Sequence, residues 1–406
     1  MIVVHWLAII LAFVAGVGTL SSTVFLALAL AGARCFHAIA RQQAAAAMRL
    51  GDNLPFVSVL KPFHGMEPQL EANLESFFNQ DYPEYEILMA VDNEDDGAVE
   101  LLRTVAARHP QRLSRTVVCG EPPWPNPPAW AFSRMAEQAR GEILVTSDSD
   151  VIVAPDYLRQ VVPPLLEKNT GMATCVYRGL STGGFWSLMD AMGMSVEMTA
   201  GVVIANWMEG MKFGLGPTIV VRRDALEAIG GYRATGEYFS NDFVTGNFIA
   251  AKGFDVALSR HVISHVVPPM TFAQMWRRHV RWAAGTRRSR PKGHLGTGLV
   301  YAVPYGVMAA LAGVMLGHPW VGLAVLAWTV VNRIVESLAI GWGVVRDPES
   351  LRRPWLYAVR DCLGFAVWVA SYLHSKIRWR NGRFELANDG RVHMRDRDGK
   401  IVSIAE

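Results

Sequence analysis

An almost uninterrupted apolar run at the start of the chain restricts its fold more than any other feature of the sequence. Residues 2–33 contain a single titratable side chain, His5. Because a bilayer core offers no partner for backbone N–H and C=O groups, such a segment can cross it only as a helix. Residues 31–33 resemble a cleavage site, but the run is too long for a signal peptide and no basic residues precede it. We expect an uncleaved anchor.

A second apolar region lies near the other end of the chain. Residues 299–317 and 320–345 are each long enough to span a bilayer, and the short loop at 318–319 joins them. The last apolar stretch, 362–373, is short and has charged residues on both sides. These properties favour a re-entrant or interfacial segment over a full crossing.

Polar side chains interrupt the second of these spans. Asn332, Arg333 and Glu336 have a spacing that puts them on one helix face. Because polar groups are costly in a membrane, we expect them to face protein or the membrane surface. Two interpretations stay open, an ion pair that locks helices together and a role in lipid binding.

Basic residues beside the apolar segments predict their orientation. By the positive-inside rule, cytoplasmic loops carry an excess of Lys and Arg. The loop at 318–319 has none, so we expect the long central region to be cytoplasmic. The basic residues on the central side are Arg34, Arg41, Arg49, Arg277, Arg278, Arg281, Arg287, Arg288, Arg290, Lys292, Arg346, Arg352, Arg353 and Arg360.

The composition excludes several classes of function. A formal net charge of +3 is too small to indicate a nucleic-acid-binding protein. Hydrophobic residues make up 51% of the chain and gather at its two ends, which indicates a membrane protein with a water-soluble middle. Neither a disulfide framework nor a zinc site is expected, because the cysteines are scattered and include no C-x-x-C pair. They are Cys35, Cys119, Cys175 and Cys362.

Strand-like and helix-like patterns alternate in the central region, which is typical of a mainly parallel sheet with right-handed crossovers. Ligands of such sheets bind at the carboxyl ends of the strands, where Asp92, Asp148 and Asp150 fall. A Pro-rich loop is expected at 121–128. The expected strands are 56–60, 86–91, 116–118 and 143–145, and the expected helices are 70–79, 100–108 and 131–140.

Two acidic clusters follow predicted strands. Residues 91–96 read VDNEDD, which suits either a binding loop or a turn whose side chains cap the next helix. Residues 147–150 read SDSD, which suits either an ordinary turn or a site for a divalent cation. Two carboxylates held close together repel each other unless positive charge lies between them. Mg²⁺ or Mn²⁺ bridging a diphosphate would supply that charge.

Two further clusters combine polar and aromatic residues. GEYFSNDF, at 236–243, places Glu237 and Asp242 in a loop before an apparent helix, where a carboxylate could be a general base; the alternative is that Asp242 is a helix N-cap. WRRHVRW carries Arg278 and Arg281 on one helical face with Trp282 beside them. That arrangement suits either a phosphate clamp or an Arg and Trp belt at the membrane interface.

With these residues in view, the chain resembles processive-type, inverting glycosyltransferases of the GT-A fold, most of all the ceramide glucosyltransferases and bacterial relatives that glycosylate hopanoids. The resemblance extends from about Pro55 to about Leu386. It rests on KPFHGMEPQLEANLESFFNQDYPEYEIL, DSD, NDF, RRHVRW and RWRNGRFEL. It implies an α/β fold with a GT-A type, mainly parallel sheet flanked by helices, an N-terminal transmembrane helix and C-terminal transmembrane or interfacial helices.

The resemblance also implies roles for individual residues through the family signature Asp, Asp, Asp, (Q/R)xxRW. Asp150 would bind the metal, Mg²⁺ or Mn²⁺, and Asp242 would be the catalytic base. The residues it assigns to the sugar nucleotide are Asp92, Asp95, Asp148, Arg278, Arg281 and Trp282. The last three would lie near the diphosphate and the mouth of the acceptor site.

This sequence departs from the family pattern at three places. Relatives commonly have Asp where Asn93 stands, so Asp92 or Asp95 would substitute for it. Asn241 replaces the acidic residue that usually precedes the third Asp. The Lys of the family's Asn-Pro-Lys stretch is Pro128 here. These changes bear on donor affinity and sugar choice more than on the class of reaction.

The resemblance predicts transfer from UDP-glucose to ceramide or a ceramide-like lipid, in a multi-pass protein of a bacterial inner membrane. UDP-N-acetylglucosamine with a hopanoid polyol, or a diacylglycerol acceptor, is also compatible. Two other functions are alternatives to this transfer. A polysaccharide synthase would need more transmembrane spans than this chain offers. A catalytically inactive membrane scaffold is the alternative from another class of function. The expected domains are an anchor (1–34), a cytoplasmic linker (35–54), a GT-A catalytic domain (55–292), a membrane region (293–376) and a cytoplasmic tail (377–406).

The Met-rich segment 184–213 is the candidate acceptor surface. Methionine side chains are soft and adaptable, which suits a lipid at the membrane surface. The residues assigned to the acceptor are Trp186, Met194 and Trp207. The alternative interpretation is that the methionines fill the core around an internal helix.

Overall fold

Two compact units make up the parts of the chain that the computed structural model describes, residues 2–373, 376–379, 382–387, 390–395 and 401–402. The sheet unit consists of residues 37–180, 209–268 and the C-terminal segment that begins at 376. The helical unit consists of the segment that ends at 36, residues 181–208 and the segment that begins at 269. Each unit is therefore assembled from segments that lie far apart in the sequence.

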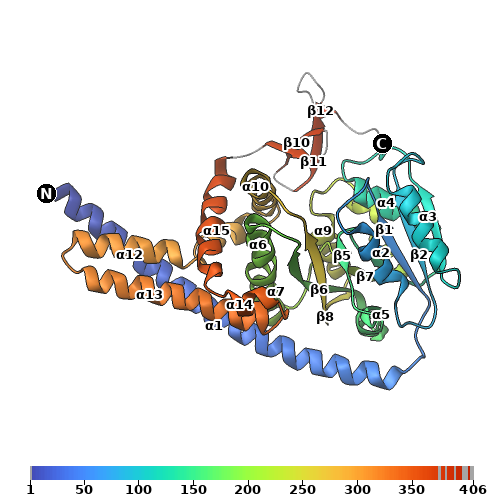
Figure 1. The fold of residues 1–406 in the computed structure, drawn as a ribbon, viewed down its shortest axis with the longest axis horizontal. Helices are drawn as coiled ribbons and strands as arrows, with labels where there is room; N and C mark the ends of the chain where they lie inside the picture. The colour runs from blue at the N-terminus through green and yellow to red at the C-terminus, as the bar shows by residue number, and fades with distance from the viewer. Residues whose placement is uncertain (1, 374–375, 380–381, 388–389, 396–400, 403–406) are drawn as a thin grey trace. The chain divides into compact units, whose positions relative to one another are not determined.

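The sheet unit contains an eight-stranded sheet with the order β3-β2-β1-β4-β7-β6-β8-β5. Figure 1 labels most of these strands, including β1, β2 and β7. Strands β3, β2, β1 and β4 are parallel, whereas β7 is antiparallel to β4 and β6, and β5 is antiparallel to β8. The predicted α/β class is confirmed, with the parallel pairing in the first half of the sheet. The strands are β1 (Val57–Pro62), β2 (Tyr85–Val91), β3 (Leu113–Val118), β4 (Ile143–Thr146), β5 (Val151–Ile152), β6 (Thr170–Ser181), β7 (Ile219–Arg222) and β8 (Asp255–Val267).

Helices flank this sheet. Helix α4 packs on β1 and β2, and α2 packs on α3 and β5. Apolar strand residues such as Val57, Val59 and Ile87 form the core with Leu74 and Phe77 of α2, and all five are fully buried. The helices are α2 (Leu70–Phe78), α3 (Val99–Arg108), α4 (Pro127–Ala136), α5 (Tyr157–Val161), η1 (Pro163–Leu166), α8 (Arg223–Ala228), η3 (Tyr232–Thr235) and α9 (Asn241–Ala251).

Within the sheet unit, helix α4 is the element whose predicted bounds differ most from the structure. It begins at Pro127 rather than at 131, because the side chain of Asn126 accepts a hydrogen bond from the backbone N–H of Ala129 and caps the helix. Pro127 and Pro128 occupy the first turn, where a missing N–H costs nothing. The Asn-Pro-Pro sequence that departs from the family pattern is therefore a helix start.

The C-terminal segment of the sheet unit forms a second, antiparallel sheet with the order β12-β11-β10-β9. Its strands are β9 (Lys376–Trp379), β10 (Gly382–Leu386), β11 (Val392–Arg395) and β12 (Ile401–Val402). The predicted tail therefore has regular structure in its described residues.

The helical unit contains the apolar segments. By length and composition, four helical stretches in the described chain could cross a membrane: 2–50, 185–209, 319–342 and 356–373. The second was not predicted to span, and its most apolar 18 residues are 72% buried inside the protein. The elements are α1 (Ile2–Leu50, of which residues 37–50 belong to the sheet unit), α6 (Phe185–Met192), η2 (Gly193–Met198), α7 (Thr199–Glu209), α10 (Phe272–Ser289), α11 (Pro291–Thr297), α12 (Val303–Met315), α13 (Pro319–Glu336), η4 (Ser337–Trp342), α14 (Pro348–Arg352) and α15 (Leu356–Leu373).

Helix α1 has 49 residues and continues past the predicted end of the anchor. At 1.5 Å per residue it measures roughly 74 Å, more than twice the ~30 Å hydrocarbon core of a bilayer. The stretch expected to be a linker, 35–54, is helical as far as Leu50, which agrees with the good helix formers Ala44 to Ala47.

Helices α12 and α15 also differ from the predicted segments. Helix α12 has 13 residues, which at 1.5 Å each measure about 20 Å, shorter than the span expected at 299–317. It starts at Val303 because the carboxylate of Asp361 accepts hydrogen bonds from the backbone N–H groups of Ala302 and Val303. Helix α15 has 18 residues and begins before the predicted stretch 362–373. Whether it crosses, re-enters or lies at the interface stays a prediction.

A buried charge cluster ties α13 to α15. The guanidinium group of Arg333 lies 2.8 Å from Oε2 of Glu336 and 3.3 Å from Oδ1 of Asp361. All three side chains are almost fully buried, as is Asn332, so these polar groups face protein, the first of the two environments expected for them. The contacts favour the helix-locking interpretation of the Arg–Glu pair.

Candidate functional site

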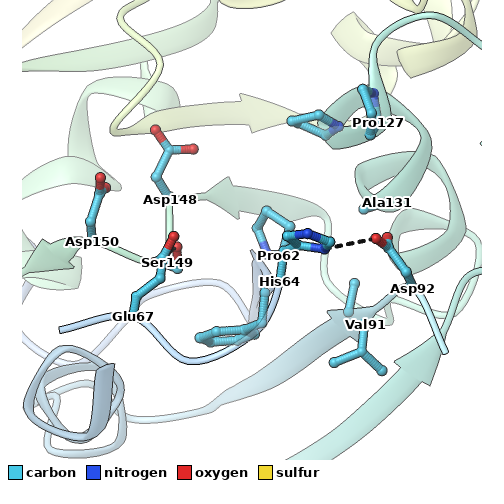
Figure 2. Close-up of a pocket in the computed structure, with 13 residues that line it drawn as sticks. Pro62, His64, Glu67, Val91, Asp92, Pro127, Ala131, Asp148, Ser149 and Asp150 are labelled. Carbon is cyan, nitrogen blue, oxygen red and sulfur yellow. Dashed lines mark hydrogen bonds and ion pairs between the residues drawn. The ribbon is translucent and has the colours of Figure 1, made fainter. Parts of the chain in front are cut away.

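A pocket of about 180 Å³ lies at the carboxyl ends of β1, β2 and β4 (Figure 2). We call it the carboxylate pocket, and its titratable lining residues are His64, Glu67, Asp92, Asp148 and Asp150. Asp92 follows β2, whereas Asp148 and Asp150 follow β4, and both strands pair with β1. The structure therefore brings these three predicted residues to one edge of the sheet, as the strand pattern predicts.

Asp242 lies next to Asp148 in the sheet unit. A Cβ atom built on Gly216 would be 3.2 Å from Oδ2 of Asp242 and 3.9 Å from Oδ2 of Asp148. The backbone N–H of Gly216 donates a hydrogen bond to the Asp242 carboxylate. A glycine at this position therefore leaves room for the two carboxylates. Asp242 is in the first turn of α9 and Ser240 occupies the cap position, so the N-cap interpretation of Asp242 is wrong.

Burial changes the acid–base properties of both carboxyl groups. It raises the pKa of Asp242, although hydrogen bonds from backbone N–H groups oppose the change. Burial also raises the pKa of Asp148 well above its usual range, and the negative charge of Asp150 adds to the rise. A carboxylate with a raised pKa is a stronger base, so Asp242 is suited to accepting a proton.

Lys61, the penultimate residue of β1, supplies positive charge beside the two aspartates of SDSD. Its Nζ donates a hydrogen bond to the backbone carbonyl of Asp148 at 2.6 Å and lies 3.8 Å from the centre of the Phe77 ring. Burial lowers the pKa of its amine to about 7, against the attraction of Asp148 and Asp150. Sequence reasoning gave this residue no role, and the available signal was a lysine at the end of a mainly apolar strand.

The two carboxylate oxygens of Asp150 differ in their contacts, since one faces a histidine and the other has no hydrogen-bond partner in the described residues. Its Oδ2 is 3.3 Å from Nε2 of His265, whereas Oδ1 is buried and has no hydrogen-bond partner in the described structure. Nearby, the hydroxyl of Ser149 donates to the carboxylate of Glu67. Within the described residues, no group of three or more His, Cys, Asp or Glu side chains could hold a metal ion alone. These few carboxylate oxygens suit a hard cation whose remaining ligands would come from a bound anion and water.

His64 and Asp92 form the opposite side of the pocket. Nδ1 of His64 is 3.0 Å from Oδ2 of Asp92, and both side chains are partly exposed. In Figure 2 this pair lies across the pocket from Asp150 and Glu67. Sequence reasoning did not single out His64, although it lies in the KPFHG stretch that carries the family resemblance.

The rest of the VDNEDD cluster has a local structural role. Asp95 is exposed and does not line the pocket, and its backbone N–H donates to Oδ1 of Asn93 at 3.1 Å. Asp96 accepts hydrogen bonds from the backbone N–H groups of Gly65 and Ala98. Asn93 and Asp96 therefore form a turn, but they do not cap the next helix, because α3 begins after Ala98 without a side-chain cap. The binding role assigned to Asp95 stays a prediction.

The predicted (Q/R)xxRW residues belong to the helical unit, on α10. The guanidinium group of Arg278 lies 4.5 Å from the centre of the Trp282 ring, and Arg281 on the same helix is partly buried. The carboxylate of Asp190 on α6 accepts a hydrogen bond from His279 at 2.8 Å and lies 3.4 Å from Arg278. Sequence reasoning missed Asp190, which looks like an isolated charge in a Met-rich segment.

The residues assigned to the acceptor lipid are in different environments within the helical unit. Met194 is buried in the π-helical segment η2, which agrees with the core-filling interpretation of the methionines. Trp186 packs against Phe185 and Phe272, with ring centres 4.9 and 4.8 Å away. Trp207 is 44% exposed. A lipid-binding role for these three residues stays a prediction.

Comparison with known proteins identifies relatives over most of the chain. The model of the family described as glycosyl transferase family 21 matches residues 14–392. Ceramide glucosyltransferase 1 of Caenorhabditis elegans is 24% identical over 354 residues, which cover 86% of this chain and 75% of that protein. Ceramide glucosyltransferase 3 of the same organism is 23% identical over 348 residues, covering 84% and 74%. Among solved structures, the mannosyltransferase PcManGT from Pyrobaculum calidifontis, in complex with GDP-Man and Mn²⁺, is 20% identical, with a TM-score of 0.46 and coverage of 86% of this chain and 98% of that one.

Proposed function

Since this chain belongs to glycosyl transferase family 21, we propose that it transfers a hexose from a UDP-sugar to a hydroxyl group of a membrane lipid, with inversion at the anomeric carbon. The observation that carries this proposal is the convergence of Asp148, Asp150 and Asp242 where ligands of parallel sheets bind. UDP-glucose is the favoured donor and a ceramide-like lipid the favoured acceptor, because the relatives are named ceramide glucosyltransferases.

The carboxylate pocket would hold the donor. Asp92 and His64 line the side that would receive the nucleoside, and Asp148 and Asp150 would lie near the diphosphate. The unpaired Oδ1 of Asp150 would bind Mg²⁺ or Mn²⁺, which supplies positive charge that stabilises a diphosphate leaving group. On α10, the residues Arg278, Arg281 and Trp282 would contribute to binding the diphosphate and the acceptor, as the family signature implies.

Asp242 would act as the general base. Its carboxylate takes the proton of the lipid hydroxyl while the hydroxyl oxygen attacks the anomeric carbon. The bond between that carbon and the diphosphate oxygen breaks, and UDP leaves with the electron pair. Attack from the face opposite the leaving group converts an α-linked donor into a β-glycoside.

The raised pKa of Asp242 predicts an acid limb in the pH dependence of kcat. As pH falls through that pKa, the carboxylate gains a proton and can no longer accept one, so kcat falls by about tenfold per pH unit. Because burial raises the pKa above its ordinary value of 3.8, the limb is expected at a higher pH than an exposed aspartate would give. Transfer under saturating donor and acceptor measures it. A kcat that stays constant down to about pH 4 would contradict a base with a raised pKa.

The apolar helices make the chain a membrane protein, and we place its sheet unit in the cytoplasm. The support is the excess of Lys and Arg beside the apolar segments on the central side, together with their absence from the loop at 318–319.

A transfer assay on the purified full-length protein tests the function. UDP-glucose and UDP-N-acetylglucosamine, each with a radiolabelled sugar, are offered with ceramide, a hopanoid polyol or diacylglycerol, in the presence of Mg²⁺ or Mn²⁺. Label in a lipid from one pair identifies the donor and the acceptor together, and we expect UDP-glucose with ceramide. Folded protein that binds nucleotide but labels none of these lipids would contradict the proposal and favour an inactive scaffold, which the changes at Asn93, Pro128 and Asn241 would suit.

A further inference from the structure

The loop that leads to Asp242 is held on one side by the start of α4. We call residues 236–240, between η3 and α9, the base loop. The backbone N–H of Asn126 donates to the carbonyl of Gly236 at 3.0 Å, and its side-chain amide donates to the carbonyl of Tyr238 at 2.8 Å. The same Asn126 caps α4, whose first residues, Pro127 and Pro128, line the carboxylate pocket. The base loop is thus fixed to a wall of the pocket.

A segment from the end of the chain holds the other side of the base loop. Phe239 donates its backbone N–H to the carbonyl of Gly390 at 3.2 Å, and Val392 donates its N–H to the carbonyl of Glu237 at 2.8 Å. Tyr238 and Arg391 form an antiparallel β-bridge between these two bonds. Both segments belong to the sheet unit. The C-terminal segment therefore pairs with the base loop as a short strand.

Side chains add to the backbone pairing. The guanidinium group of Arg391 lies 5.6 Å from the centre of the Tyr238 ring and 3.6 Å from Oε2 of Glu237. Its Nε donates to the Tyr238 hydroxyl at 3.4 Å. Gly390 has a φ of 84°, in the left-handed region that favours glycine, and its N–H donates to the carbonyl of Ala387. The described residue before Arg391 therefore has a backbone conformation that glycine adopts readily.

We propose that the C-terminal segment Gly390–Val392 positions the base loop, and through it the carboxylate of Asp242, for proton transfer. Asp242 follows Phe239, the last residue paired with the segment, by three positions, so a displacement of the loop would move the start of α9. An error of about 1 Å in the placement of a reacting group can reduce a rate by about a hundredfold. The segment acts through Asp242 and is a positioning element. The inference rests on the proposed function, because it takes Asp242 to be the base.

A proline at 392 tests the proposal, since it removes the N–H that pairs with Glu237. Val392→Ala is the matched control, because it shortens the same buried side chain but keeps the N–H. In the full-length protein, we expect Val392→Pro to lower kcat for transfer by roughly tenfold or more while the Kd for the UDP-sugar changes by less than about twofold. Val392→Ala should retain kcat within about twofold. Equal kcat values in the two variants would overturn the proposal, and so would a loss of donor binding in parallel with kcat, which indicates general damage.

A second pair of variants covers the case in which Val392→Pro does not fold. Arg391→Ala removes the ion pair with Glu237 and the contact with Tyr238, whereas Arg103→Ala removes an exposed arginine from α3. We expect Arg391→Ala to lower kcat without changing the Kd for the UDP-sugar, and Arg103→Ala to change neither. A kcat equal to that of Arg103→Ala would overturn a positioning role for this side chain.

Hydrogen exchange separates failure of this inference from failure of the proposed function. The Phe239 amide, bonded to Gly390 in the intact protein, should exchange at least about tenfold faster in Val392→Pro than in Val392→Ala. This measurement needs no substrate. If the wild type transfers no sugar, the proposed function fails, and the exchange rates still decide whether the segment orders the loop. Equal exchange rates in the two variants would overturn the inference even if the wild type is active.

Discussion

Asp242→Asn is expected to reduce sugar transfer by about 10²- to 10⁴-fold, the usual contribution of general base catalysis. The amide has nearly the same shape as the carboxylate and keeps an oxygen that can accept the N–H of Gly216, so the start of α9 should be preserved. It cannot accept a proton from the lipid hydroxyl. Donor binding by calorimetry and transfer to the lipid, measured on the same preparation, should therefore separate, with Kd retained and kcat lost.

The control for this substitution is Asp255→Asn, which changes an exposed aspartate at the start of β8. It should leave both Kd and kcat within about twofold of the wild type, because surface substitutions have small effects. Near-normal kcat in Asp242→Asn would remove Asp242 from the role of base. Loss of donor binding together with kcat would indicate that the carboxylate is needed to build the pocket rather than for proton transfer.

Asp150→Ala is expected to abolish the response of the protein to Mn²⁺ or Mg²⁺. The variant removes the buried Oδ1 that has no hydrogen-bond partner, together with the oxygen that faces His265. In the wild type, UDP with Mn²⁺ at 100 times its Kd should stabilise the fold by about 2.7 kcal/mol. Thermal unfolding with and without UDP and Mn²⁺ measures this effect independently of activity, and we expect none in the variant.

Two comparisons sharpen the test of Asp150. Asp150→Asn keeps a hydrogen-bonding oxygen but removes the charge, and it should resemble Asp150→Ala if the residue binds a cation. Glu67→Gln changes another carboxylate that lines the pocket, which already accepts the hydroxyl of Ser149. It should keep part of the response to Mn²⁺. Full stabilisation by UDP and Mn²⁺ in Asp150→Ala would move the metal site to the other carboxylates.

The strand ends of the sheet unit could be predicted from the sequence because their signals are local. An apolar run such as Ile143 to Val145 can be recognised as a buried strand, and the polar residues that follow must then lie at its carboxyl end. Because parallel strands bring these ends to one edge, Asp92 and Asp150 could be placed together from spacing alone. Both line the carboxylate pocket.

The other residues of the site depend on contacts between distant segments, which periodicity does not reveal. Lys61 looks like a surface residue until β1 is placed between β2 and β4, where it is fully buried beside Asp148. The need for glycine at 216 becomes clear only in the fold, where the carboxylate of Asp242, 26 positions later in the sequence, lies where a side chain at 216 would be. The pairing of Arg391 with Tyr238 spans 153 positions, and no pattern in either segment predicts it.

The charge cluster of Arg333, Glu336 and Asp361 also bears on how the protein is made. A charged residue in the middle of a membrane helix costs about 2.5–3.5 kcal/mol on insertion scales, so it needs a partner. Synthesis produces α13 before α15, and Asp361 comes 28 residues after Arg333. Until it emerges, Glu336 on the same helix is the partner that this cluster offers to Arg333. If α13 crosses a membrane, we expect a chain that ends before α15 to insert it less stably than the full chain, because Asp361 would be missing from the cluster.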